Sequence, residues 1–183
     1  MDSTDTVISK AGTEDAQAVV DLSSEVQIAL TASGSLQQTG PLDLQDVQKA
    51  IAAGHCYAIK NDAGLVGCAF AKPMTPSVIA EEYGDQSLKI SHHVNPWLYM
   101  HSIMLRPGLQ GRGLGRVLVD GVVRCIELKH TRGTIFLDCW AGNDKLKAFY
   151  KRVAFDFVQN VPQRDHEVAL FCRKLESRHP EAG

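Results

Sequence analysis

A run of glycines in the second half of the chain has the composition of an anion-binding turn. Gln110–Gly115 (QGRGLG) follows an apolar segment and precedes a segment with helical periodicity. Glycines allow a tight turn whose N–H groups point inward with no Cβ in the way. Such N–H groups bind anions together with the positive end of the following helix, and Arg106, Arg112 and Arg116 add positive charge. The segment therefore predicts a site for a pyrophosphate, with a plain structural turn as the alternative.

Two common phosphate-binding motifs do not describe this turn. A P-loop requires Gly-x-x-x-x-Gly-Lys-Ser/Thr, and no Lys-Ser or Lys-Thr pair follows the glycines. The dinucleotide-binding fingerprint requires a third glycine where Leu118 stands, and it normally opens a series of βαβ units rather than lying past the midpoint. The pattern that fits is Gln/Arg-x-x-Gly-x-Gly/Ala, which resembles the phosphate turn of the GNAT acyltransferase superfamily.

Two longer segments resemble this superfamily in the right order. Ile103–Gly115 (IMLRPGLQGRGLG) is similar to its strand, proline-led turn and pyrophosphate loop. Leu137–Phe157 (LDCWAGNDKLKAFYKRVAFDF) resembles its next strand, the Asn that opens the next helix and a Tyr seven residues later. The likeness covers Trp97–Phe157 well, whereas the first half agrees only in the order of its elements. Ala154 departs from the pattern, because a glycine is usual there.

The resemblance implies an acetyl-coenzyme A-dependent N-acetyltransferase whose acceptor is a primary amine of a small molecule or a protein. It implies that the pantetheine arm pairs with the backbone of Met104 and Leu105, and that Asn143 and Phe149 contact the cofactor. It also implies that the pyrophosphate lies on the turn and its flanks, at Arg106, Leu109, Gln110, Gly111, Arg112, Gly113, Leu114, Gly115 and Arg116. A domain that senses acyl-coenzyme A without turnover, or an enzyme that uses another acyl group, is the alternative.

Acetyl transfer to an amine requires the nitrogen as its neutral base. An alkyl amine has a pKa of about 10, so only roughly one molecule in a thousand is neutral at pH 7, a cost of about 4 kcal/mol. A base recovers part of this cost. His101 is the candidate base, because an imidazole has a pKa of about 6.5, which suits proton transfer. Alternation along the strand predicts that His101 shares one face with Tyr99, Ile103 and Leu105. A histidine held in the sheet by a structural hydrogen bond is the alternative.

Tyr150 is the candidate acid for the departing thiolate. A thiol has a pKa of about 8.5 and a tyrosine of about 10, so proton donation is uphill by only about 2 kcal/mol. A hydrogen bond to the developing thiolate already stabilises it. The alternative is a core aromatic at helical spacing with Leu146 and Phe149. The spacing of seven residues from Asn143 favours the functional interpretation.

A mixed sheet is needed to position these residues. Strand 97–105, helix 114–129 and strand 134–140 form a right-handed crossover, so the two strands are parallel. The flanking hairpins are antiparallel, which predicts an α/β (α+β) class with a mostly antiparallel sheet around one central parallel βαβ unit. The resemblance implies that the parallel strands splay apart. The other expected strands are 6–10, 56–60, 65–71, 155–159 and 166–175, and the other helices begin near 13 or span 42–53, 78–83 and 143–152.

Composition limits the function classes. The chain of 183 residues suits a single domain, 1–183, with flexible tails at about 1–5 and 176–183. A net charge of -2 gives no basic field for nucleic acid, and no apolar run is long enough for a membrane span. The five cysteines lie in apolar runs without Cys-x-x-Cys spacing, which predicts reduced core thiols, no metal site and a cytoplasmic location. A homodimer is compatible with the sequence.

Overall fold

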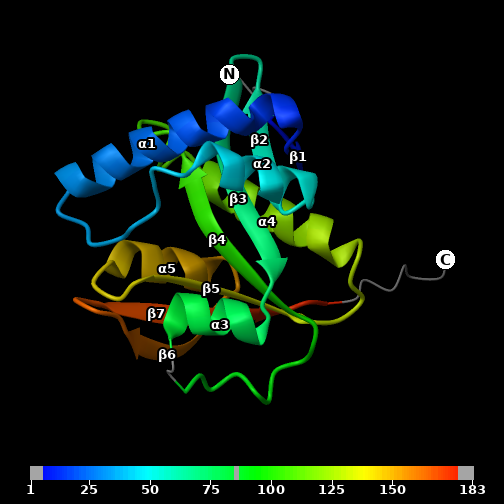
Figure 1. The fold of residues 1–183 in the computed structure, drawn as a ribbon, viewed down its shortest axis with the longest axis vertical. Coiled ribbons are helices and arrows are strands. Elements are labelled where there is room, and N and C mark those ends of the chain that lie inside the picture. The colour runs from blue at the N-terminus through cyan, green and yellow to red at the C-terminus, as the bar shows by residue number, and fades with distance from the viewer. Residues whose placement is uncertain (1–5, 85–86, 177–183) are drawn as a thin grey trace. The chain divides into compact units, whose positions relative to one another are not determined.

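The computed structural model describes residues 6–84 and 87–176 (Figure 1). Within them, seven strands follow the order β1-β2-β3-β4-β5-β7-β6. The strands are β1 Val7–Lys10, β2 Cys56–Asn61, β3 Gly64–Pro73, β4 Trp97–Leu105, β5 Thr134–Trp140, β6 Asp156–Pro162 and β7 Glu167–Lys174. The helices are a short η1 Thr13–Asp15, α1 Ala16–Ala32, α2 Leu44–Ala52, α3 Pro76–Tyr83, α4 Leu114–Glu127 and α5 Asp144–Arg152.

The strand pairing confirms the predicted fold class. β4 and β5 are parallel, whereas β1–β2, β2–β3, β5–β7 and β6–β7 are antiparallel. The parallel pairing joins Trp97–Tyr99 to Thr134–Phe136, while β5 pairs with β7 as far as Trp140. The parallel ladder thus covers the first three residues of each strand, and the splaying of the two strands stays a prediction.

The described residues pack as two compact units. The first contains the chain up to Lys72 and Met100–Val122, and the second contains Pro73–Tyr99 and the chain from Val123 onward. The chain thus changes unit at the last residue of β3, inside β4 and inside α4. The expectation of a single domain stays a prediction, and the predicted tails lie outside the described residues except for Glu176.

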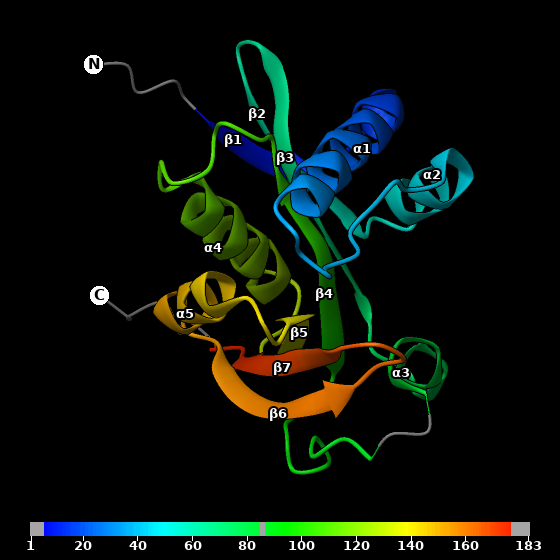
Figure 2. The same ribbon diagram turned by 90° about the vertical axis from the view of Figure 1, so that its left-hand side faces the viewer.

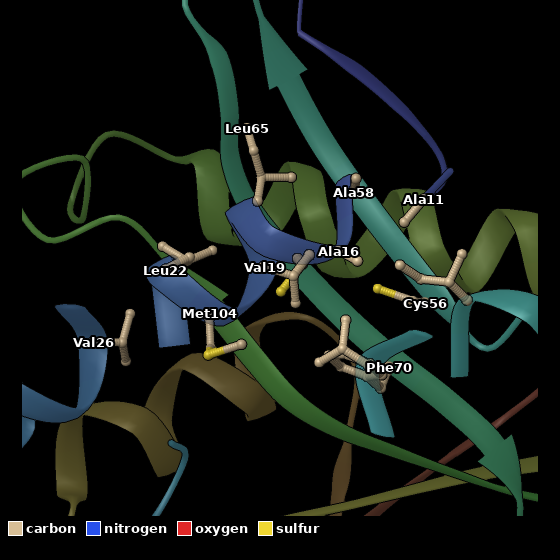
Figure 3. Packing of buried hydrophobic residues seen from close by; sticks show 13 residues of the cluster. Ala11, Ala16, Val19, Leu22, Val26, Cys56, Ala58, Leu65, Phe70 and Met104 are labelled. Carbon is tan, nitrogen blue, oxygen red and sulfur yellow. The ribbon is translucent and has the colours of Figure 1, made fainter. Parts of the chain in front are cut away.

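The first unit has an apolar core between its helices and its strands (Figure 3). Val19, Leu22 and Val26 recur at helical spacing along α1, and each is almost fully buried. They pack with α2 and with the buried face of β2, β3 and β4, through Val47, Ile51, Cys56, Ala58, Leu65, Cys68, Phe70 and Met104. This apolar layer holds the strand that leads to the glycine-rich turn.

Gly67 in β3 allows a close approach of two backbones in this unit. A Cβ at this position would lie 2.7 Å from the Met104 carbonyl oxygen and 2.6 Å from Leu105 Cδ2. We therefore expect Gly67→Ala to lower the free energy of unfolding by about 2 kcal/mol, the usual range for overpacking against a rigid neighbour. Urea denaturation measures it, and a loss below about 0.5 kcal/mol would show that β3 and β4 separate without strain.

In the second unit, α3 and α5 lie on opposite faces of the strands (Figure 2). On one face, α3 and the segment after it pack through Tyr83 and Ile90 onto the strands. On the other face, the Tyr150 ring of α5 contacts Phe155 and Phe171, with ring centroids 6.2 and 5.8 Å apart. The unit is therefore a three-layer arrangement in which α5 is fixed by aromatic packing. The strand residues of the first face include Tyr99, Phe136, Val161, Val168, Leu170 and Cys172.

The end of α5 adopts a left-handed cap without a glycine. Ala154 has a φ of 63°, its N–H donates to Lys151 O, and the Phe155 N–H donates to Tyr150 O. This is the hydrogen-bond pattern of a Schellman motif, in which glycine normally supplies the positive φ. Because a Cβ costs about 1 kcal/mol or more in this region, we expect Ala154→Gly to raise the free energy of unfolding by about 1 kcal/mol. Urea denaturation of the two proteins measures the change, and a loss of stability would contradict it.

The five cysteines are free thiols, as predicted, and all but Cys125 are buried. None of the helices in the described part of the chain combines the length and apolarity that a membrane crossing requires.

Candidate active site

The glycine-rich turn lies between β4 and α4 and is open to a ligand. Gly108, Gly111 and Gly113 have φ values of 86°, 78° and 81°, which side chains rarely adopt. A Cβ at any of the three would meet no atom within 4 Å. The glycines are therefore required by the backbone conformation and not by packing, and they leave the backbone of the turn approachable.

The turn runs directly into the start of α4. The Gly113 carbonyl accepts the N–H groups of Arg116 and Val117 at 3.1 and 3.2 Å, so the intrahelical hydrogen bonds begin there. The first N–H groups of a helix have no intrahelical acceptor, so those of Leu114 and Gly115 point out of the helix end. An approachable turn followed by a helix N-terminus fits a pyrophosphate.

Two of the three arginines at the turn are held by weak ion pairs. Arg106 Nε lies 3.8 Å from Glu25 Oε2, and Arg116 Nε lies 3.3 Å from Asp120 Oδ2. Such pairs between solvent-exposed groups contribute little, so a phosphate can compete for either guanidinium. Arg112 is exposed on the turn itself. The first unit therefore contains both the positive charge of these arginines and the backbone N–H groups of the turn.

His101 lies on β4 in the first unit and is mostly enclosed. Its ring stacks on Phe70 with centroids 5.3 Å apart, and its Nδ1 lies 3.2 Å from Ser102 Oγ. Burial first, and then the charges of Lys72 and His55, lower the pKa of His101 to about 3. The imidazole is therefore neutral at physiological pH and is a weak proton acceptor.

The predicted alternation along β4 is wrong, because Ser102 breaks it. Ser102 has a φ of 47° inside the strand, as in a β-bulge, which shifts the side-chain period by one residue. Accordingly, His101 stacks on Phe70, and Met104, three residues later, packs in the same cluster as Phe70. His101 therefore does not share one face with Ile103 and Leu105.

Three predicted residues lie on or beside α5 in the second unit. The Asn143 side chain caps this helix, because its Oδ1 accepts the Leu146 N–H at 3.0 Å. Phe149 is half-buried with its ring 5.5 Å from that of Tyr150. Helix capping alone thus explains an Asn at this position, and contact of Asn143 with a cofactor stays a prediction.

Tyr150 has a buried ring and an unpaired hydroxyl. Only 4% of the residue is exposed, yet its hydroxyl has no hydrogen-bond partner among the described residues. No fully buried side-chain oxygen or nitrogen in that part of the chain lacks a partner, so the hydroxyl retains access. Burial first, and then Cys139 and Asp138, raise the pKa of Tyr150. Full proton donation to a thiolate is therefore costlier than the about 2 kcal/mol inferred from the sequence, and a hydrogen bond from the neutral phenol is favoured.

A polar cluster in the second unit was missed by the sequence analysis. Asp138 on β5 accepts hydrogen bonds from the hydroxyls of Tyr83 and Tyr99, at 2.5 and 3.0 Å. Its one sequence signal is a carboxylate inside a strand, Thr134–Trp140, whose other residues apart from Thr134 are apolar. The two tyrosines come from α3 and β4, and no local spacing connects them to it.

The predicted residues are thus divided between the units. The first unit brings together His101 on β4 and the whole turn from Met104 to Arg116, whereas Asn143, Phe149 and Tyr150 lie in the second. Each unit therefore has its own set of candidate groups.

Comparison with known proteins identifies the family. The model of the Acetyltransferase (GNAT) family matches residues 26–155. The uncharacterized N-acetyltransferase YesJ of Bacillus subtilis (strain 168) is 27% identical over 148 residues, which is 79% of this chain and 78% of that protein. A GNAT-family acetyltransferase of Streptococcus agalactiae has a TM-score of 0.73 at 18% identity, over 92% of this chain and 94% of that one. YncA, a putative acetyltransferase of Salmonella typhimurium solved with its cofactor acetyl-CoA, has a TM-score of 0.67 at 14% identity, over 98% of this chain and 99% of that one. The chain therefore belongs to the GNAT family of acetyltransferases.

Proposed function

We propose that this acetyltransferase moves the acetyl group of acetyl-coenzyme A to a primary amine of a small molecule or a protein. The observation that carries the proposal is the open turn with positive φ at Gly108, Gly111 and Gly113, followed by the start of α4. Acetyl-coenzyme A bound to YncA, a structural neighbour, supports the same cofactor here.

The chain's own groups have distinct roles in this proposal. The N–H groups from Leu109 to Gly115 hold the pyrophosphate, and the backbone of Met104 and Leu105 pairs with the pantetheine arm. Asn143 and Phe149 contact the arm. The Tyr150 hydroxyl donates a hydrogen bond to the sulfur as negative charge develops there.

His101 has a limited role in the proposal. Because its pKa is lowered to about 3, it remains a neutral imidazole throughout the physiological range. A neutral imidazole accepts a hydrogen bond from an amine, directly or through a water molecule, but holds the transferred proton poorly. We therefore assign His101 to orienting the acceptor.

An amine panel with acetyl-coenzyme A tests the proposal. We expect thiol release that depends on the amine, and a mass gain of one acetyl group on the amine, for at least one of spermidine, tyramine, glucosamine, lysine and a peptide with a free N-terminus. Reactions without amine, and protein without cofactor, correct for hydrolysis and for the protein's own thiols. Saturable binding of acetyl-coenzyme A with no thiol release from any amine would instead indicate a sensor.

A further inference from the structure

The carboxylate of Asp138 has one occupied oxygen and one available oxygen. Both tyrosine hydroxyls, from Tyr83 and Tyr99, donate to Oδ2. Among the described residues Oδ1 has no hydrogen-bond partner. Since no fully buried oxygen in that part of the chain lacks a partner, Oδ1 is accessible, which agrees with the partial exposure of the residue. The cluster therefore presents a fixed carboxylate oxygen to a ligand.

The surroundings of Asp138 raise the pKa of its carboxyl group above that of a surface aspartate. Burial raises its pKa, while the hydroxyls of Tyr83 and Tyr99 and the nearby His166 lower it, and the net direction is upward from 3.8. Glu82 on α3 interacts electrostatically with Tyr83 and Tyr99, and Cys139 on β5 interacts with Asp138. A carboxylate in such a setting binds a cation and is a better proton acceptor than usual.

The charge of Asp138 also reaches the candidate proton donor. Asp138 is one of the groups that raise the pKa of Tyr150, and both residues belong to the second unit. The candidate proton acceptor, Asp138, and the candidate hydrogen-bond donor, Tyr150, are therefore close enough for the charge of one to change the pKa of the other.

We propose that Asp138 Oδ1 binds the amino group of the acceptor and takes its proton, while Tyr83 and Tyr99 are positioning residues that hold Oδ2. The inference rests on the proposed acetyl transfer to an amine. The nitrogen forms a bond to the acetyl carbonyl carbon, the carbon–sulfur bond breaks, and the electron pair of that bond goes to sulfur. An ammonium acceptor loses two protons overall: Asp138 passes one to water, and the other ends on the leaving sulfur, so the products are the amide, the coenzyme A thiol and one released proton.

His101 is a poorer candidate for this step on electrostatic grounds. Burial is the largest cause of its lowered pKa, and the interactions with Lys72 and His55 that lower it further also disfavour an ammonium nearby. Asp138 has the opposite charge and attracts the ammonium. The acceptor is therefore expected to bind as a cation at Asp138.

Asp138→Asn is the main test, because an amide oxygen still accepts the two phenol hydrogen bonds but does not take a proton at neutral pH. With the amine of highest turnover from the panel, we expect kcat/KM to fall at least about 100-fold, with coenzyme A affinity changed less than about threefold. Asp156→Asn, on an exposed strand position in the same unit, is the matched control and should keep full activity.

Stability gives a second readout that does not depend on activity. A folded-state pKa raised above 3.8 means that Asp138 contributes stability below that pH and loses it as the pH rises through the folded value. At pH 7 the Asn variant should therefore be at least as stable as the wild type, and the difference should vanish below about pH 3.8. A merely structural Asp138 would make Asp138→Asn less stable at pH 7, which would overturn the proposal.

Tyr83→Phe tests the positioning role through the pH profile. The Tyr83 hydrogen bond lowers the pKa of Asp138, so its removal should move the acidic limb of kcat/KM to higher pH. Tyr57→Phe, a buried tyrosine of the first unit, should leave the limb unchanged. An Asp138→Asn enzyme within threefold of wild type, or an unmoved limb in Tyr83→Phe, overturns the role of Asp138 alone. A wild type without any amine-dependent turnover overturns both this inference and the proposed function.

Discussion

Tyr150→Phe is expected to lower kcat about 100-fold while coenzyme A affinity changes less than about threefold. The substitution removes only the hydroxyl, which has no hydrogen-bond partner among the described residues. The aromatic ring stays packed between Phe155 and Phe171, so the free energy of unfolding should change by less than about 0.5 kcal/mol. Loss of one hydrogen-bond donor to a developing negative charge typically costs about 100- to 1000-fold in kcat. Steady-state kinetics and coenzyme A titration measure the two effects.

Tyr57→Phe is the matched control for this substitution. Tyr57 is also buried, at 3% exposed, but it lies on β2 in the first unit. It should keep the wild-type kcat. Equal losses of kcat and coenzyme A affinity in Tyr150→Phe would show that Tyr150 shapes the cofactor site and does not act on the sulfur.

The elements with strong local signals could be predicted from the sequence. β5 and α5 agree with the predicted ranges to within a residue, because β5 is apolar on both faces and α5 begins at an Asn cap. The turn between β4 and α4 was also expected from its glycines. Gly108, Gly111 and Gly113 have a positive φ, whereas Gly115 lies in the first turn of α4. In these places local periodicity and turn chemistry determine the structure.

The bulge in β4 could not be predicted in the same way. Ser102 is neither Gly nor Asn, and nothing in its neighbours signals a positive φ. The irregularity occurs where His101 stacks on Phe70 and where Met104 packs in the same cluster as Phe70, and these are tertiary contacts. The face on which His101 lies was consequently assigned incorrectly.

The hydrogen-bonded cluster of Asp138, Tyr83 and Tyr99 could not be predicted from the sequence for another reason. Tyr83 is 55 positions before Asp138 and donates from α3, whose helix was predicted at 78–83 but without any indication of which strand it packs against. A single carboxylate in an apolar strand indicates a buried charge, and burying a charge costs free energy unless other groups bind it. The sequence does not say which groups those are. Only the fold shows that two phenols bind the same oxygen and leave the other available.

These two omissions concern the same function. The sequence locates groups that bind a phosphate through local backbone conformation, because glycines and a helix start are local features. It does not locate a proton acceptor whose basicity depends on tertiary burial first and then on distant neighbours, such as Lys72 for His101 and the two tyrosines for Asp138. The cofactor side is thus better predicted than the acceptor side.

Gly113→Glu should raise the dissociation constant of coenzyme A at least about 100-fold. The residue has a φ of 81°, and a Cβ there points into space free of other atoms within 4 Å, so a long side chain occupies the region that a ligand would approach. A carboxylate close to a pyrophosphate repels it, and two unit charges of like sign 4 Å apart near a protein surface cost up to about 4 kcal/mol. A factor of 100 corresponds to about 2.8 kcal/mol, well within that range.

Gly34→Glu separates this effect from strain and added charge. Gly34 has a φ of 75° and equally open surroundings, but it follows α1 rather than lying on the turn. Both variants should lose similar stability, because each places a side chain in the left-handed region. Isothermal titration should show near wild-type coenzyme A binding for Gly34→Glu alone. Equal affinities of the two variants would mean that the backbone around Gly113 does not hold the diphosphate, and Leu114 and Gly115 would then have no role at the start of α4 beyond forming the helix.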